Sequence, residues 1–281
     1  MTKPTSHNNA KPIIVYWPGA WGGRSDGASF WTIRLKQELA RRLRTLELSW
    51  YRIRYRGNSL EEMAIHAMGQ LRQIVDLAQA EGRPLWVINY SMGAQVARAT
   101  FALATAKGET VVIDRLLEIS PCPASGITRA KLFSLFRAAP YSLCLSFITG
   151  RLAVRTVWEA KRLFFSGWTR QNGSPHQPPV DQFARDIVSF SMRNPEPLWQ
   201  LGCQLFLRRV DCPRLSSRHH VVVFAKDNDP FTTGLDDLGA RSPVAVQTTL
   251  VRSHGSLLWP VADDFKQAIK RLVDPWPYPQ A

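Results

Sequence analysis

Short apolar runs alternate with longer amphipathic segments over most of the chain. The runs are rich in β-branched and aromatic residues and end at Gly, Pro, Asn or Asp, which is typical of buried strands. The longer segments carry apolar residues at helical spacing. The predicted strands span Ile13–Trp17, Leu46–Tyr55, Leu85–Ile88, Arg115–Ile119, His220–Ala225 and Val244–Val251, and the predicted helices span Phe30–Leu43, Ser59–Ala80, Ala94–Lys107 and Asp263–Leu272.

Strands that alternate with helices predict an α/β fold with a mainly parallel sheet and helices on both of its faces. We expect residues 1–120 and 216–281 to form the two parts of this core. In such sheets the reactive groups gather beyond the carboxyl ends of the strands. Three chemically competent residues follow predicted strands directly, and these are Ser91, Asp229 and His254.

The alternation stops between residues 121 and 215. This segment holds eight of the 13 Phe and carries 13 Lys and Arg against 5 Asp and Glu. We interpret it as a mainly helical cap, or lid, inserted into the core. Arg151, Arg155 and Arg162 share one helical stripe, and a solvated helix face is the favoured interpretation. Attraction of a phosphate, a pantetheine-linked group or an anionic headgroup, and peripheral contact with a membrane surface, stay open as alternatives.

Overall charge narrows the partner class only slightly. The chain has 36 Lys and Arg against 22 Asp and Glu, a formal net charge of +14, which favours acidic partners of any kind. No nucleic-acid recognition motif accompanies this charge, so nucleic-acid binding is not expected. The N-terminal residues lack an apolar signal segment, and no uncharged stretch reaches the roughly 20 residues of a membrane span, so we expect a soluble, cytoplasmic protein.

The metal-binding residue types show no pattern that would hold an ion. The four cysteines form no CxxC pair, and the histidines are scattered apart from adjacent His219 and His220. Neighbouring residues of a strand point to opposite faces, which makes this pair unsuited to joint ligation. We therefore expect structural thiols, no metal and no cofactor.

Ser91 lies in Asn89-Tyr90-Ser91-Met92-Gly93, between a predicted apolar strand and an Ala-rich helix. This is a variant of the G-x-S-x-G nucleophile elbow, whose small flanking residues let strand, turn and helix approach closely. Gly93 meets that need, whereas Asn89 stands where the pattern has its first glycine. We expect Ser91 to be the nucleophile.

A serine needs a base to accept its proton, and the base needs a carboxylate to orient it. His254 follows the last predicted strand and is the expected base. Asp227 and Asp229 both follow the fifth strand, and we favour Asp229 because it lies deeper in the turn, with Asp227 as the alternative.

A developing oxyanion needs backbone N–H donors. The N–H of Met92, directly after the nucleophile, is one expected donor. The second is expected from the glycine-rich loop after the first strand, with Ala20 as the best candidate and its neighbour Trp21 as a substrate contact.

These motifs resemble those of the α/β-hydrolase superfamily. Pro18-Gly19-Ala20-Trp21 is similar to its H-G-x oxyanion motif, Asn-Tyr-Ser-Met-Gly to its G-Y-S-M-G elbow, and Lys226–Pro230 to its G-x-x-D-P acid turn, a register that selects Asp229. The resemblance implies the α/β-hydrolase fold and a serine esterase or thioesterase. Because Asn89 departs from the elbow pattern, no particular relative's substrate is carried over.

The expected function is hydrolysis of a carboxylic ester or thioester of a small molecule with an apolar acyl group, through an acyl-enzyme at Ser91. The alternative is a non-catalytic protein of the same fold that binds an anionic partner through its basic cap. The presence of serine, acid and histidine in this chain order favours the enzyme.

Overall fold

Six parallel strands form one sheet in the computed structural model, which describes residues 11–19, 30–57, 59–121, 215, 217–224, 246–250 and 263–274. The predicted elements are recovered within a few residues of their expected ends. They are β1 (Ile13–Trp17), α1 (Phe30–Arg42), β2 (Ser49–Arg52), α2 (Leu60–Ala80), β3 (Leu85–Tyr90), α3 (Met92–Ala106), β4 (Ile113–Ile119), β5 (Ser217–Phe224), β6 (Val246–Leu250) and α10 (Asp263–Val273).

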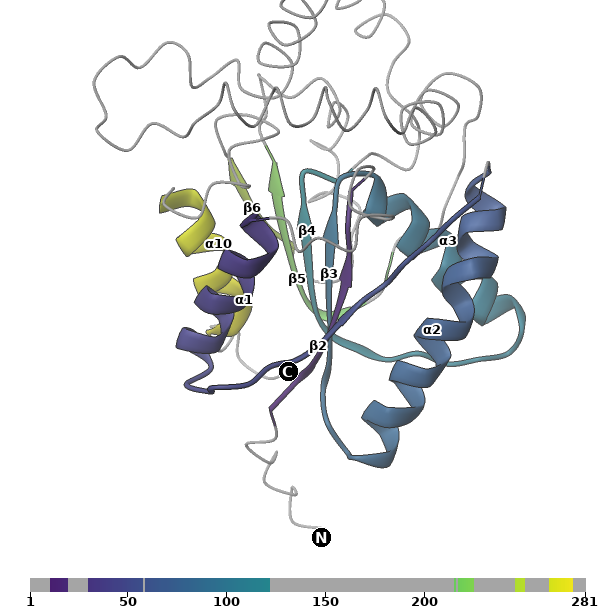
Figure 1. The fold of residues 1–281 in the computed structure, drawn as a ribbon. Helices are drawn as coiled ribbons and strands as arrows, with labels where there is room; N and C mark the ends of the chain where they lie inside the picture. The colour runs from purple at the N-terminus through teal and green to yellow at the C-terminus, as the bar shows by residue number, and fades with distance from the viewer. Residues whose placement is uncertain are drawn as a thin grey trace, which may run out of the picture.

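The strands lie in the order β2-β1-β3-β4-β5-β6, and each neighbouring pair is parallel. Helices α2 and α3 cover one face of the sheet, while α1 and α10 cover the other (Figure 1). The predicted α/β class, with a parallel sheet between two helical layers, is therefore confirmed.

The apolar pattern explains why the sheet is central. Every residue of β1 and of β3 is buried, as expected for strands covered on both faces. Odd and even positions then feed two separate cores. Ile13 and Val15 pack beneath α2 and α3. Ile14 and Tyr16 pack against α1 and α10.

A local signal sets the start of α2. The Ser59 hydroxyl accepts a hydrogen bond from the Glu62 N–H (3.1 Å), so Ser59 caps α2. Within the described ranges, no helix has both the length and the apolar character needed to cross a bilayer. The proposed cap segment, residues 121–215, lies outside these ranges apart from Pro121 and Leu215.

The register aligns the carboxyl ends of four strands in one row. Tyr90 pairs with Ile119, Ile119 with Val223, and Val223 with Thr249. The segments that follow β3, β4, β5 and β6 therefore all leave the sheet at the same edge.

Candidate active site

The site lies where the strand order of the parallel sheet reverses, since β1 is followed by β2 on one side and β3 by β4 on the other. β1 and β3 are neighbours, but the helix after β1 covers one face and the helix after β3 covers the other. At such a point the loops leaving the two strands diverge, and a crevice opens between them. The loop that begins at Pro18 and the turn at Ser91 flank this point.

Ser91 occupies the turn between β3 and α3 in a strained backbone conformation. Its φ is 50° and its ψ is −122°, a combination that non-glycine residues rarely adopt. The Ser91 N–H donates to the Ile119 carbonyl (3.0 Å), which ties the turn to the end of β4. Its side chain makes no capping hydrogen bond to α3. A strained residue between a strand and a helix is the backbone arrangement that a nucleophile elbow requires.

Gly93 allows β1 and α3 to approach closely enough to form this turn. A Cβ placed on Gly93 would lie 2.4 Å from both the Trp17 and the Pro18 carbonyl oxygens. These are backbone atoms, which cannot swing aside as a side chain can. The second elbow glycine is therefore required by direct contact with the first strand.

The loop after β1 lies against the turn at Ser91. A Cβ on Gly19 would meet the Tyr90 ring at 2.8 Å and the Ser91 Cβ at 3.4 Å. The buried Tyr55 hydroxyl donates to the carbonyls of Pro18 (2.5 Å) and Gly19 (3.2 Å) and so anchors the start of this loop. Tyr55 was not predicted as a site residue from the sequence, although a buried tyrosine hydroxyl generally requires a partner.

Met92 is the first residue of α3 and is fully buried. Its N–H belongs to the first turn of a helix, where backbone donors have no intrahelical acceptor. The same N-terminus carries the positive end of the helix dipole. The Met92 N–H therefore has the properties required of an oxyanion donor next to Ser91.

Asn89 is fully buried at the position of the first elbow glycine. In register it lies between Trp17 of β1 and Glu118 of β4, on the sheet face that α3 covers. Neither its amide nitrogen nor its amide oxygen has a hydrogen-bond partner within the described part of the chain. The elbow thus accommodates an asparagine side chain, which extends beneath α3.

A buried charged cluster lies beside this asparagine. Arg98 Nη2 donates to Glu118 Oε1 (2.8 Å), and His220 Nε2 lies 3.0 Å from Glu118 Oε2. Burial alone would raise the pKa of the Glu118 carboxyl, but the Arg98 charge and the His220 hydrogen bond outweigh it and lower the pKa to about 2. Because the ionised carboxylate only accepts hydrogen bonds, His220 Nε2 carries the proton. No local sequence pattern around Arg98, Glu118 or His220 predicts that the three side chains meet.

Several predicted site residues lie outside the described residues: Ala20, Trp21, Asp227, Asp229 and His254. The structure brings together Ser91, Met92 and the first residues of the β1 loop. Among the residues that are described, no group of three or more His, Cys, Asp or Glu could hold a metal ion.

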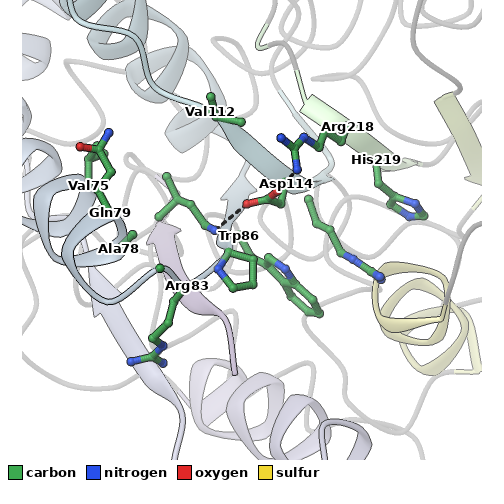
Figure 2. A pocket seen from close by; sticks show the side chains of 13 residues that line it. Val75, Ala78, Gln79, Arg83, Trp86, Val112, Asp114, Arg218 and His219 are labelled. Carbon is green, nitrogen blue, oxygen red and sulfur yellow. Dashed lines mark hydrogen bonds and ion pairs between the residues drawn. The ribbon is translucent and has the colours of Figure 1, made fainter. Parts of the chain in front are cut away.

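A separate groove of about 670 Å³ opens at the opposite, amino-terminal edge of the sheet (Figure 2). Its wall includes Asp114, which accepts hydrogen bonds from the Leu85 N–H (2.9 Å) and from Arg218 (3.0 Å). Trp86 lies under the Arg115 guanidinium at 4.9 Å. The groove lies at the starts of β3, β4 and β5, so it is remote from the turn at Ser91, which follows the end of β3.

The model of the alpha/beta hydrolase family matches residues 14–268. The search of curated proteins gives no significant match.

Solved structures of similar fold include two esterases and a thioesterase domain. The esterase from Exiguobacterium antarcticum has a TM-score of 0.56 at 12% identity, covering 94% of this chain and 91% of its own. The Pyrobaculum calidifontis esterase has a TM-score of 0.52 at 13% identity, covering 96% and 77%. The Vlm2 thioesterase domain has a TM-score of 0.51 at 13% identity, covering 93% and 92%.

Proposed function

Because the chain belongs to the alpha/beta hydrolase family, we propose that it is a serine hydrolase that cleaves a carboxylic ester or thioester through an acyl-enzyme at Ser91. The observation that carries this proposal is the backbone of Ser91. A serine held at φ 50° between a buried strand and a helix is costly unless the strain serves a function. The strain holds its hydroxyl at the carboxyl edge of the sheet, where family members react with substrate.

His254 is the proposed base and Asp229 the acid that orients it, with Asp227 as the alternative acid. Parallel strands lie about 4.8 Å apart, so the ends of β5 and β6 are about 10 Å and 14 Å from the end of β3. Val223 and Thr249 share a row with Tyr90. Asp229 follows Val223 by six residues, and His254 follows Thr249 by five. Extended segments of these lengths can span at least roughly 16 Å, so both side chains can reach Ser91.

The reaction begins when His254 takes the Ser91 Oγ proton and Oγ attacks the substrate carbonyl. The tetrahedral oxyanion accepts hydrogen bonds from the N–H groups of Met92 and Ala20. Collapse of this intermediate breaks the bond to the alcohol or thiol, which leaves with the proton from His254. Water, deprotonated by His254, then attacks the acyl-enzyme and releases the carboxylic acid and free Ser91.

The proposed substrate is a small-molecule ester or thioester with an apolar acyl group. Esterases and a thioesterase domain among the structural neighbours support this class, and Trp21 is proposed to contact the substrate beside Ala20. Residues 121–215, rich in Phe and basic residues, are proposed to form a lid over the strand ends. The chain leaves the sheet at Ile119, the last residue of β4, and returns to it at Ser217, the first residue of β5. An insertion between two core strands requires this arrangement.

The nucleophile is tested by fluorophosphonate labelling of the full chain followed by peptide mass spectrometry. We expect the adduct on Ser91 and expect Ser91→Ala to lose both the label and p-nitrophenyl ester hydrolysis, by about a thousandfold or more. Thermal unfolding of the variant controls for its fold. Turnover at the wild-type rate in a folded Ser91→Ala protein would contradict the mechanism.

The acid is tested by comparing two isosteric changes. Asp229→Asn should lower kcat by about four orders of magnitude, because the amide imposes the wrong histidine tautomer and removes the charge that stabilises imidazolium. Asp227→Asn is the matched control and should cost far less. If the ranking of the two kcat values is reversed, the role of acid passes to Asp227.

A further inference from the structure

Three buried charged or protonatable side chains join the nucleophile helix to two strands of the sheet. Arg98 comes from α3, Glu118 from β4 and His220 from β5. Their side chains are 2%, 2% and 7% exposed, and both carboxylate oxygens of Glu118 are bonded. Each of these hydrogen bonds prefers a particular distance and angle, whereas an apolar packing contact has no preferred direction.

Stability alone is a weak explanation for such a cluster. Removing charges from water costs several kcal/mol per ion, and replacement of a buried ion pair by apolar residues is often neutral or stabilising. Directional bonds, in contrast, determine how two elements sit against each other. The cluster therefore points to a requirement for a particular placement of α3.

The placement of α3 sets the position of the reactive groups. Ser91 is its N-cap and Met92 its first residue. Arg98 follows Ser91 by seven residues, about two helical turns, so both lie on the same side of the helix. Glu118 directly precedes Ile119, whose carbonyl accepts the Ser91 N–H at 3.0 Å.

Helix α3 is thus bonded to the end of β4 at two points, one at its N-terminus and one about two turns further along. One tie is the hydrogen bond from the Ser91 N–H to Ile119, and the other is the Arg98–Glu118 ion pair. His220 extends the second tie to β5, the strand that precedes Asp227 and Asp229 in the chain.

We propose that Arg98, Glu118 and His220 are positioning residues for the hydrolytic reaction, which fix the rotation and height of α3 and thereby the Ser91 Oγ and the Met92 N–H. This inference rests on the proposed function of Ser91. In this proposal the three residues do not contact the substrate. Their effect is therefore on the rate of attack and not on substrate affinity.

Glu118→Gln is the first test, because it is isosteric and removes the charge that both partners require. We expect kcat and the rate of fluorophosphonate labelling to fall by about tenfold to a hundredfold, with KM for p-nitrophenyl esters within about twofold. Asp114→Asn is the matched control, since Asp114 lies on the same strand and also has two partners, but at the opposite edge of the sheet. It should destabilise the protein while kcat stays at the wild-type value.

Two further variants separate positioning from stability. The triple change Arg98→Met, Glu118→Leu and His220→Leu removes all three polar groups together and is expected to unfold cooperatively at a temperature close to wild type. It should still react slowly. His220→Gln retains an N–H that can donate to Glu118 and should keep a higher kcat than His220→Leu.

Wild-type labelling rates in the folded triple variant and in Glu118→Gln would overturn the positioning proposal. Hydrogen exchange of the α3 amides from Met92 to Val96 supplies a readout that needs no catalysis. Exchange should accelerate in Glu118→Gln and not in Asp114→Asn. If wild-type Ser91 takes no label, the proposed function fails, and the exchange comparison still decides whether the cluster positions α3.

Discussion

A Cβ on Gly93 would lie 2.4 Å from the backbone carbonyl oxygens of Trp17 and Pro18, so the lack of a side chain lets α3 and the turn at Ser91 lie close to the end of β1. A side chain at this position would have to displace the backbone at the end of β1, at Trp17 and Pro18. Gly69 on α2 offers a contrast, since a Cβ placed on it meets no atom within 4 Å. Gly93 is therefore required for steric reasons, whereas Gly69 is not.

Gly93→Ala should lower the free energy of unfolding by about 3 kcal/mol or more, because overpacking against backbone cannot relax. The labelling rate of Ser91 should fall as well, since β1 and α3 must separate. Gly69→Ala, in the exposed interior of α2, should instead raise stability by about 0.5–1 kcal/mol. Chemical denaturation of both variants measures the contrast, and equal stabilities would refute the close-contact argument.

Asn89 and Tyr55 show two ways in which a buried polar residue is accommodated near the elbow. The Tyr55 hydroxyl has two carbonyl acceptors, so it orders the start of the β1 loop. The Asn89 amide has no partner within the described ranges, so its burial costs roughly 1–3 kcal/mol. The strain at Ser91 and the cost at Asn89 fall within three residues of each other, as is typical of functional sites.

At the scale of elements, the helical stripe predicted for Arg151, Arg155 and Arg162, which lie outside the described residues, has competing interpretations. A solvated face predicts that the three side chains have no effect on reaction with any substrate. Guidance of an anionic substrate predicts an effect on charged substrates alone, weakened by salt over a screening length of about 8 Å. The two interpretations are therefore distinguished by comparing a neutral substrate with an anionic one.

Replacement of all three arginines by Gln should leave KM for neutral p-nitrophenyl esters within about twofold of wild type, because Ser91 and its partners are untouched. For acyl-CoA, the favoured solvated-face interpretation predicts an equally small change. A KM rise for acyl-CoA that shrinks as salt increases would instead assign the arginines to substrate guidance. The matched control carries the same loss of charge at three exposed lysines of the core: Lys11, Lys107 and Lys270.

At the scale of the whole molecule, two buried groups couple folding to pH in the same direction. The pKa of His219 is lowered to about 4, chiefly by burial and then by the Arg115 charge. The unfolded chain therefore binds a proton below pH 6.5 that the folded protein refuses until about pH 4, and stability falls across that window. Glu118, with its pKa lowered to about 2, adds a second loss as pH falls from 4.5.

The free energy of unfolding should thus decline steadily from pH 6.5 downward, when measured by urea denaturation at constant ionic strength. His219→Gln should flatten the decline above about pH 4, and Glu118→Gln should flatten the decline at lower pH. A wild-type stability that is level between pH 6.5 and pH 4 would contradict the burial of neutral His219.

The sequence by itself determined the elements, their order and the strand–turn–helix unit at Ser91. Apolar periodicity reports which side of a segment is buried, and turn residues report where the segment ends, so both are local. The capping of α2 by Ser59 and the turn at Ser91 are of this kind. The α/β class followed from the alternation of strands and helices.

Only the tertiary structure decided which loop lies beside Ser91 and which charges are buried beneath α3. The strand order places β1 next to β3, and Tyr55 reaches the β1 loop from 37 residues away. Glu118 bonds Arg98 across 20 residues and His220 across 102. A charged residue in an apolar strand can be buried only when a side chain of opposite charge or a hydrogen-bond partner contacts it. Long-range packing decides which side chain makes that contact, and local sequence patterns carry no information about it.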